Sequence, residues 1–181
     1  MVKADFFQMQ VSKVSGQPVS QGASEVLIVG AGPSGLMMAI QLLRHGVHPV
    51  LIDQNLGPIP QGGTTILKAR SLEMLDQLGV LERVIEKGEK LSKLAFIGRE
   101  SPLDLEELPD PTTRFLYVLA IPTVQLVRVL IDYLTTKAFK IRWNTRLVHL
   151  KEKDDGVEIK VQQATASLEP DETWEMAWVI G

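Results

Sequence analysis

The chain has 181 residues, of which 45% are hydrophobic and 23% are charged, the ordinary balance of one globular domain with a proper core. Its formal net charge of -3 argues against a general affinity for nucleic acid or for an anionic membrane, and no apolar run approaches the roughly 20 residues that a membrane-spanning helix needs. The absence of cysteine excludes disulfides, thiolate metal sites and cysteine nucleophiles, and the three scattered histidines predict no metal site.

Residues 1–24 predict a flexible leader ahead of a single domain at 25–181. The segment from Gly16 to Gly22 is rich in glycine, glutamine, serine and proline, which is typical of a linker. The leader lacks the charged start, the long apolar stretch and the small-residue cleavage site of a secretory signal. We therefore expect a cytoplasmic protein.

A strand–helix–strand unit opens the domain. Glu25 to Val29 is a mainly apolar run that ends in glycine, as a buried parallel strand should. Ser34 to His45 follows as a helix that Gly46 ends, and Val50 to Ile52 forms the second strand. Such a unit implies a right-handed crossover between parallel strands.

Three more helices and two more strands are predicted before residue 140. The helices are Lys68–Leu78, Val80–Lys87 and Pro122–Phe139, the strands are Leu94–Ile97 and Phe115–Ile121, and the loops are Gln54–Gly63 and Ser101–Pro111. Pro122 suits the first turn of its helix because the missing N–H has no partner there.

Only strands are predicted after residue 140. They are Ile141–Trp143, Arg146–Lys151, Gly156–Gln163 and Thr173–Ile180. The pair Asp155-Gly156 is a strong hairpin signal between two of them. In the last strand Trp174 and Trp178 would point to the same face, which predicts core packing for both. These strands together predict a β-meander.

A glycine-rich turn joins the first strand to the first helix and matches G-x-G-x-x-G. Its residues are Gly30, Ala31, Gly32, Pro33, Ser34 and Gly35. Gly30 permits the tight turn, Gly32 lets the backbone approach a pyrophosphate, and Gly35 lets the helix pack close to the strand. The first amides of the helix then face the phosphates, aided by the helix dipole. The pattern alone is weak, but its place between a strand and a helix is what a dinucleotide-binding turn requires.

An acidic residue, Asp53, ends the second strand eighteen residues after Gly35. A carboxylate there accepts hydrogen bonds from the adenosine ribose and repels the 2′-phosphate of NADP. The competing interpretation is a glycine-rich turn of another α/β fold. The unit by itself does not distinguish FAD from NAD, but a plain NAD domain would continue with alternating strands and helices rather than with a meander.

These motifs resemble those of the flavoprotein aromatic hydroxylases, the family of p-hydroxybenzoate hydroxylase and phenol hydroxylase. The resemblance rests on the glycine-rich turn with Leu42, Gly46 and Asp53, on the helix Ala69–Gly79, on Pro122–Leu130, and on Val157–Val161 followed by Trp174–Gly181. It implies an α/β fold, a Rossmann-like FAD-binding domain with a parallel sheet plus a β-meander. The domain would be incomplete at the C-terminus, because the chain ends before the family's Asp-Gly motif.

The resemblance also implies cofactor contacts beyond the turn and Asp53, at Gln54, Thr64 and Thr123. Three positions depart from the family's pattern. Gly63 and Thr64 stand where the family has an Arg-Ala pair that contacts the flavin and the pyrophosphate, and Thr123 replaces a glutamine. The sequence predicts no catalytic acid, base or nucleophile, which agrees with the resemblance, because in this family the cofactor carries the chemistry.

The implied function is that of an N-terminal fragment of an FAD-dependent monooxygenase. The parent enzyme would use NAD(P)H and hydroxylate aromatic or polyketide-like substrates through a flavin C4a-hydroperoxide, and the fragment alone would be inactive. One alternative is a non-catalytic FAD-binding module or split-gene subunit that complements another chain. Another is a different flavoenzyme, such as a reductase or a halogenase. A hydrophobic sheet edge around Trp174 to Ile180 predicts self-association or dependence on a partner.

Overall fold

The computed structural model describes residues 25–59, 62–94, 103–104, 112–165 and 172–181. The expected leader, 1–24, lies outside the described residues, as do 95–97 of one expected strand. None of the described helices is long and apolar enough to cross a membrane.

A three-stranded parallel sheet with the order β11-β1-β2 lies at the centre of the fold, and the predicted parallel pairing is confirmed. Its strands are β1 (Val26–Val29), β2 (Val50–Ile52) and β11 (Trp178–Ile180), and helix α1 (Pro33–Arg44) connects the first two. Leu27 pairs with Val50 on one side and with Val179 on the other, so β1 is the middle strand. Both ends of the described chain therefore meet at β1.

An antiparallel sheet with the order β3-β7-β4 packs with the remaining helices. Its strands are β3 (Thr64–Leu67), β7 (Val118–Pro122) and β4 (Glu89–Leu91), and the helices are α2 (Ala69–Gln77), α3 (Leu81–Ile85) and α4 (Thr123–Thr136). All three helices were predicted, whereas β3 and β4 were not. A two-stranded ribbon of β5 (Lys93–Leu94) and β6 (Leu103–Asp104) is also present, so the predicted loop at 101–111 is wrong at 103–104.

The third sheet is the predicted β-meander, with the order β10-β9-β8. Its strands are β8 (Thr145–Lys153), β9 (Gly156–Gln163) and β10 (Glu172–Met176). Lys153 pairs with Gly156, so the hairpin turn consists of Asp154 and Asp155, one residue earlier than the sequence signal.

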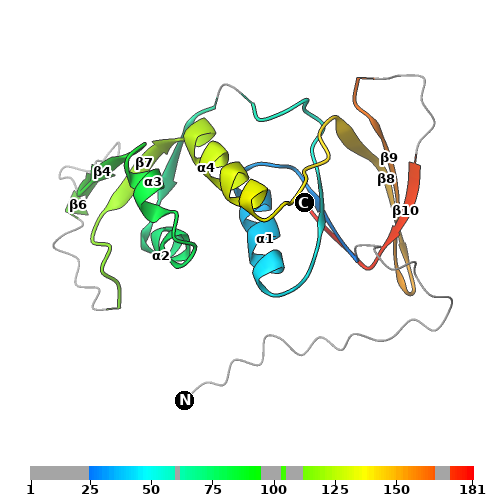
Figure 1. Ribbon diagram of the computed structural model, residues 1–181, viewed down its shortest axis with the longest axis horizontal. Helices are drawn as coiled ribbons and strands as arrows, with labels where there is room; N and C mark the ends of the chain where they lie inside the picture. Colours follow the sequence, from blue (N-terminus) through cyan, green and yellow to red (C-terminus); the bar gives the residue numbers. More distant parts are fainter. Residues whose placement is uncertain (1–24, 60–61, 95–102, 105–111, 166–171) are drawn as a thin grey trace, which may run out of the picture.

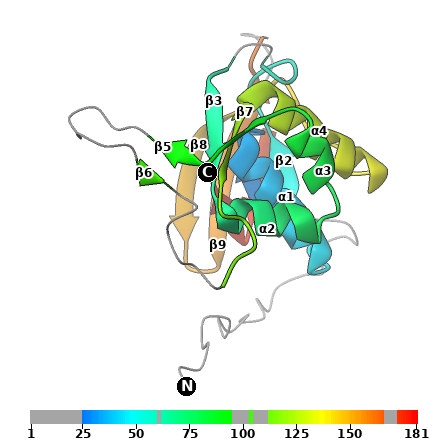
Figure 2. The same cartoon turned by 90° about the vertical axis from the view of Figure 1, so that its left-hand side faces the viewer.

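Two clusters of buried side chains lie on opposite faces of the parallel sheet. On β1, Ile28 points into the larger cluster with the helices and the β3-β7-β4 sheet, and Leu27 points into a smaller cluster with the meander. The smaller cluster comprises Leu27, Ile52, Ile159, Val161 and Met176. The parallel sheet is therefore covered on both faces, which explains its continuous apolar sequence. Figure 1 shows α1 and α4 between the sheet with β7 and the meander, and Figure 2 views the molecule end-on, with β7 and α2 in front and the meander strands β8 and β9 behind.

The expected strand Thr173–Ile180 is two strands in two different sheets. β10 pairs antiparallel with β9, and after Ala177 the chain enters the parallel sheet as β11. Trp178 is 51% exposed, so the predicted core packing is wrong for this tryptophan. The sequence predicts one strand because large apolar side chains keep a two-residue spacing from Trp174 to Ile180 across the break. The residues after Glu175 are all apolar, as suits a strand that is covered on both faces.

Two smaller expectations also need correction. In the segment Ile141–Trp143, only an isolated parallel bridge between Arg142 and Ile52 forms. Pro122 ends β7 and caps α4 from outside, with φ -56° and ψ 125°, so it precedes the first helical turn instead of lying in it. Because proline has no backbone N–H, Pro122 itself adds no unpaired donor at the helix start.

Candidate nucleotide-binding site

In the glycine-rich turn, the backbone of Gly30 lies directly against that of Gly35. Gly30 has a φ of +102°, a conformation that other residues rarely adopt, and its N–H donates to the carbonyl oxygen of Ile52 at 2.8 Å. A Cβ on Gly35 would lie 2.0 Å from the carbonyl oxygen of Gly30. The close approach of helix to strand that the sequence predicts at Gly35 is therefore present.

The start of α1 presents unpaired backbone donors. Gly32 is the N-cap residue, Pro33 opens the helix, and no side chain caps it. Among the described residues, no hydrogen-bond acceptor is paired with the amides of Gly32, Ser34 and Gly35. A Cβ built on Gly32 would meet no atom within 4 Å, so the space beside this residue is open. Free donors and the positive end of a helix dipole together favour an anion at this position.

Asp53 is hydrogen-bonded to the glycine-rich turn. Its Oδ2 accepts the N–H of Ala31 at 2.7 Å, and its Oδ1 accepts both the N–H and the Nδ2 of Asn55 at 2.8 Å. The sequence places a carboxylate at this point but gives no sign of these contacts. An ionised carboxylate has about four acceptor positions, so capacity for a further donor remains.

A cavity of about 200 Å³ lies between the turn, the loop after β2 and α4. Its lining residues are Ala31, Gly32, Pro33, Asp53, Asn55, Gly57, Pro58, Ile59, Gly62, Thr123, Val124, Val127 and Trp143. Five of the predicted site residues are thus brought together, namely Ala31, Gly32, Pro33, Asp53 and Thr123. Gly30, Ser34, Gly35, Gln54 and Thr64 are not part of the lining. Among the described residues, the lining contains no lysine or arginine.

Thr123 joins the start of α4 to the segment before β3. Its N–H and its Oγ1 both donate to the carbonyl oxygen of Gly63, at 2.9 and 2.8 Å. Since the Thr123 hydroxyl proton is used there, the 2.8 Å contact with the Thr65 hydroxyl has Thr65 as its donor. A Cβ on Gly63 would meet nothing within 4 Å. The departure from the family's Arg-Ala pair therefore leaves open space beside a fixed backbone.

The sequence prediction missed the lining residues of the loop after β2, the apolar residues of α4, and Trp143. The helical spacing of apolar residues marks Val127 as buried, but nothing local indicates that it faces the same space as Asp53. Trp143 follows Asp53 by 90 residues, and the two lie side by side because the segment around Arg142 pairs with the end of β2.

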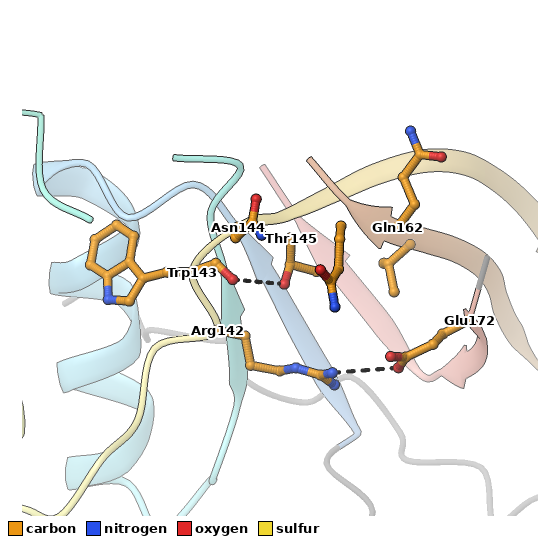
Figure 3. A pocket seen from close by; sticks show the side chains of 8 residues that line it. Arg142, Trp143, Asn144, Thr145, Gln162 and Glu172 are labelled. Atoms are coloured by element: carbon orange, nitrogen blue, oxygen red, sulfur yellow. Dashed lines mark hydrogen bonds and ion pairs between the residues drawn. The ribbon is translucent and has the colours of Figure 1, made fainter. Parts of the chain in front are cut away.

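A second cavity, of about 270 Å³, lies on the other side of the segment 142–145, against the meander. Arg142 lies 3.4 Å from Glu172 in an ion pair and 4.6 Å above the ring of Trp174. Figure 3 shows this pair, with the side chain of Trp143 directed away from it. No predicted cofactor contact lies in this second cavity. In the part of the chain that the structure describes, no cluster of three acidic or histidine side chains could hold a metal ion.

Comparison with known proteins gives one family match over most of the chain. A model of the family described as "FAD binding domain" matches residues 23–181. Rifampicin monooxygenase from Streptomyces venezuelae is 34% identical over 135 residues, which cover 75% of this chain and 28% of the relative. Pentachlorophenol 4-monooxygenase from Sphingobium chlorophenolicum is 30% identical over 171 residues, which cover 91% of this chain and 30% of the relative.

Solved structures agree with the sequence relatives. The OxyS anhydrotetracycline hydroxylase from Streptomyces rimosus superposes with a TM-score of 0.74 at 27% identity, covering 86% of this chain and 30% of that one. The p-nitrophenol 4-monooxygenase PnpA from Pseudomonas putida has a TM-score of 0.73 at 22% identity, which supports the fold alone. The chain thus spans about 30% of the length of the two monooxygenases that it matches in sequence.

Proposed function

Because this chain belongs to the FAD binding domain family of the flavin-dependent monooxygenases, we propose that it binds the ADP moiety of FAD in such an enzyme. The observation that carries the proposal is the cavity in which the uncapped start of α1 and the carboxylate of Asp53 lie together. The turn would hold the pyrophosphate, and Asp53 would accept a ribose hydroxyl.

The residues present fit this cofactor. Open space beside Gly32 admits a phosphate to the backbone, and the amides of Gly32, Ser34 and Gly35 are free to donate. Asp53 has an acceptor position left for a hydroxyl donor. Since the described lining has no cationic side chain, the amides and the helix dipole would stabilise the charge of the pyrophosphate.

The contacts proposed for the rest of the cofactor are Thr123, Thr64 and Gln54. Thr123 lines the cavity and is held by two bonds to Gly63. Thr64 and Gln54 are exposed and stand beside the lining, on β3 and just after Asp53. We propose that they contact the cofactor where it extends beyond the cavity.

We further propose that the parent protein is a monooxygenase acting on aromatic or polyketide-like substrates with NAD(P)H as reductant. Bound FAD would supply the redox and oxygen chemistry. The residues of this chain would bind and orient the cofactor and exclude water from its ADP end. The names of the relatives, which mention rifampicin, pentachlorophenol and anhydrotetracycline, support the substrate class.

A second candidate is an FAD-binding module that acts together with another chain. Strand β11 stands at the edge of the parallel sheet, and the half-exposed Trp178 lies on it. An edge strand offers unpaired backbone groups to a further strand. Self-association or a complementing chain would satisfy them.

The test is retention of flavin by the purified 181-residue chain. FAD is added, and the visible absorbance and the flavin fluorescence are followed during titration. We expect a shifted absorbance and quenched fluorescence that are weakened in Asp53→Ala and unchanged in Asp132→Ala, whose carboxylate lies on the exposed face of α4. No binding by the folded wild-type chain would contradict the proposal that this chain holds the ADP moiety by itself.

A further inference from the structure

We propose that Trp143 forms the wall of the cavity against which the adenine base of the nucleotide packs. The inference rests on the proposed function, since it assigns the base to a side chain of the same cavity. The glycine-rich turn and the Asp53 carboxylate do not distinguish one base from another. Trp143 would be the part of the site that recognises the base.

The backbone around Trp143 is fixed to β2 and to the loop that follows it. The N–H of Arg142 donates to the carbonyl oxygen of Leu51 at 2.9 Å, and the N–H of Asp53 donates back to Arg142 at 3.0 Å. Farther along, the N–H of Thr145 donates to the carbonyl oxygen of Asp53 at 2.8 Å. Asn144 donates to Asn55 at 2.7 Å. Four hydrogen bonds therefore hold Trp143 beside Asp53.

The order of the groups matches the order of a nucleotide. β1 and the glycine-rich turn lie on one side of β2, and the segment with Trp143 lies on the other. Asp53, at the end of β2, bonds to Ala31 of the turn and to the backbone on either side of Trp143. A molecule with its pyrophosphate at the turn and its ribose at Asp53 therefore extends its base toward Trp143.

The chemistry of Trp143 suits a heteroaromatic base. It is the only aromatic residue among the described lining residues, it is partly buried, and it packs against the larger core cluster. Its side chain is directed away from Arg142 and Glu172, so it does not belong to the neighbouring ion pair (Figure 3). A large, fixed π-face favours stacking or edge contact with another aromatic ring.

The competing explanation is that Trp143 only fills space at the edge of the core. The two explanations differ in what the residue does to different ligands. A packing residue would affect every ligand of the cavity alike, whereas a wall for the base affects ADP and leaves inorganic pyrophosphate unchanged.

The experiment measures the dissociation constants of ADP and of inorganic pyrophosphate by calorimetry with the full chain. The variants are Trp143→Leu, which removes the π-face, Trp143→Phe, which retains one, and Trp178→Leu as an exposed control. Base–aromatic stacking of the usual strength predicts that Trp143→Leu raises the dissociation constant of ADP roughly 5- to 100-fold. We expect a smaller rise in Trp143→Phe, no change in Trp178→Leu, and no change for pyrophosphate in any variant.

Equal affinity of wild type and Trp143→Leu for ADP would overturn the inference and leave the proposed function standing. Parallel losses for ADP and pyrophosphate would also overturn it, in favour of simple packing. A wild-type chain that binds neither ADP nor FAD would remove the proposed function, and the inference with it.

If Trp143→Leu does not fold, a second measurement applies. In the variant Trp174→Phe/Trp178→Phe, Trp143 is the only tryptophan, since the chain has three. Saturation with ADP should quench its fluorescence, and an unchanged spectrum at saturation would refute the contact.

Discussion

Gly35→Ala should unfold or strongly destabilise the domain, whereas Gly32→Ala should leave it folded but unable to hold a dinucleotide tightly. The two glycines lie three residues apart in the same turn, so composition and local sequence are matched. They differ in what an added methyl group would meet.

At Gly35 the new Cβ would lie 2.0 Å from the carbonyl oxygen of Gly30 and 3.2 Å from its carbonyl carbon. Contacts of Cβ atoms under 3.0 Å are essentially never seen, so the helix and the turn would have to separate by about 1 Å. Both sides of the clash are backbone, and no side chain can rotate away. Overpacking of this kind costs about 1–3 kcal/mol, and we expect the upper end, near 3 kcal/mol.

At Gly32 the backbone has φ -74° and ψ 178°, which any residue adopts, and no atom lies within 4 Å of the new Cβ. The stability should therefore change by less than about 1 kcal/mol, and it could rise because the unfolded chain loses freedom. The methyl group would instead stand in the open space beside the amide that faces the cavity. We expect at least a tenfold loss of FAD affinity, equivalent to about 1.4 kcal/mol.

Thermal unfolding followed by circular dichroism measures the first effect, and FAD titration measures the second. A loss of 3 kcal/mol in a chain of this size lowers Tm by about 6–12 °C. The reasoning is refuted if Gly35→Ala keeps the wild-type Tm, because the close approach of α1 to β1 would then be absent. It is equally refuted if Gly32→Ala binds FAD as tightly as the wild type.

Three further outcomes are expected. Asp53→Asn should weaken FAD binding about tenfold in a titration, and an unchanged affinity would speak against the ribose contact. It should also lower the free energy of unfolding in urea by about 1–3 kcal/mol, because the Asp53 carboxylate accepts hydrogen bonds from two backbone N–H groups. The hydrogen bond between Lys153 and Glu158 lowers the pKa of Glu158 and raises that of Lys153, so the stability from this pair is present near neutral pH and is lost as the pH falls through the folded pKa of Glu158. In Lys153→Met, NMR titration should find the Glu158 pKa returned toward its ordinary value. An unchanged Glu158 pKa would contradict the pairing. Leu119→Ala, at a fully buried position of β7, should cost about 2–5 kcal/mol in urea unfolding, whereas Leu56→Ala, 74% exposed, should stay within about 0.5 kcal/mol; equal effects would refute the assigned core.

The unit around the glycine-rich turn was predictable from the sequence because its constraints are local. Gly30 must adopt a positive φ and Gly35 must admit the carbonyl oxygen of Gly30, and both needs are visible in the residue types. The helices were predictable for the same reason, since their apolar spacing reports one buried face. Asp53 was identified by its spacing after the turn.

The parts that were not predictable depend on distant partners. Strand β3 has exposed residues, and β4 is only three residues long; each forms because β7 pairs with it. The break at Ala177 is hidden because large apolar residues keep a two-residue spacing from Trp174 to Ile180. In the site, the bond from Ala31 to Asp53 and the position of Trp143 beside it depend on how neighbouring segments pair, which sequence spacing does not report.

The pairing of β1 with β11 has a consequence for the order of assembly. Val26, at the start of the described chain, takes Trp178, near its end, as its parallel neighbour. Closing a loop of that length costs chain entropy before any contact repays it, and such pairings slow folding. During synthesis β1 and α1 would leave the ribosome long before β11 exists, with one edge of β1 unpaired. We therefore expect the parallel sheet to be completed late, and the unfinished chain to be the state in which this protein is most exposed to aggregation and to chaperones.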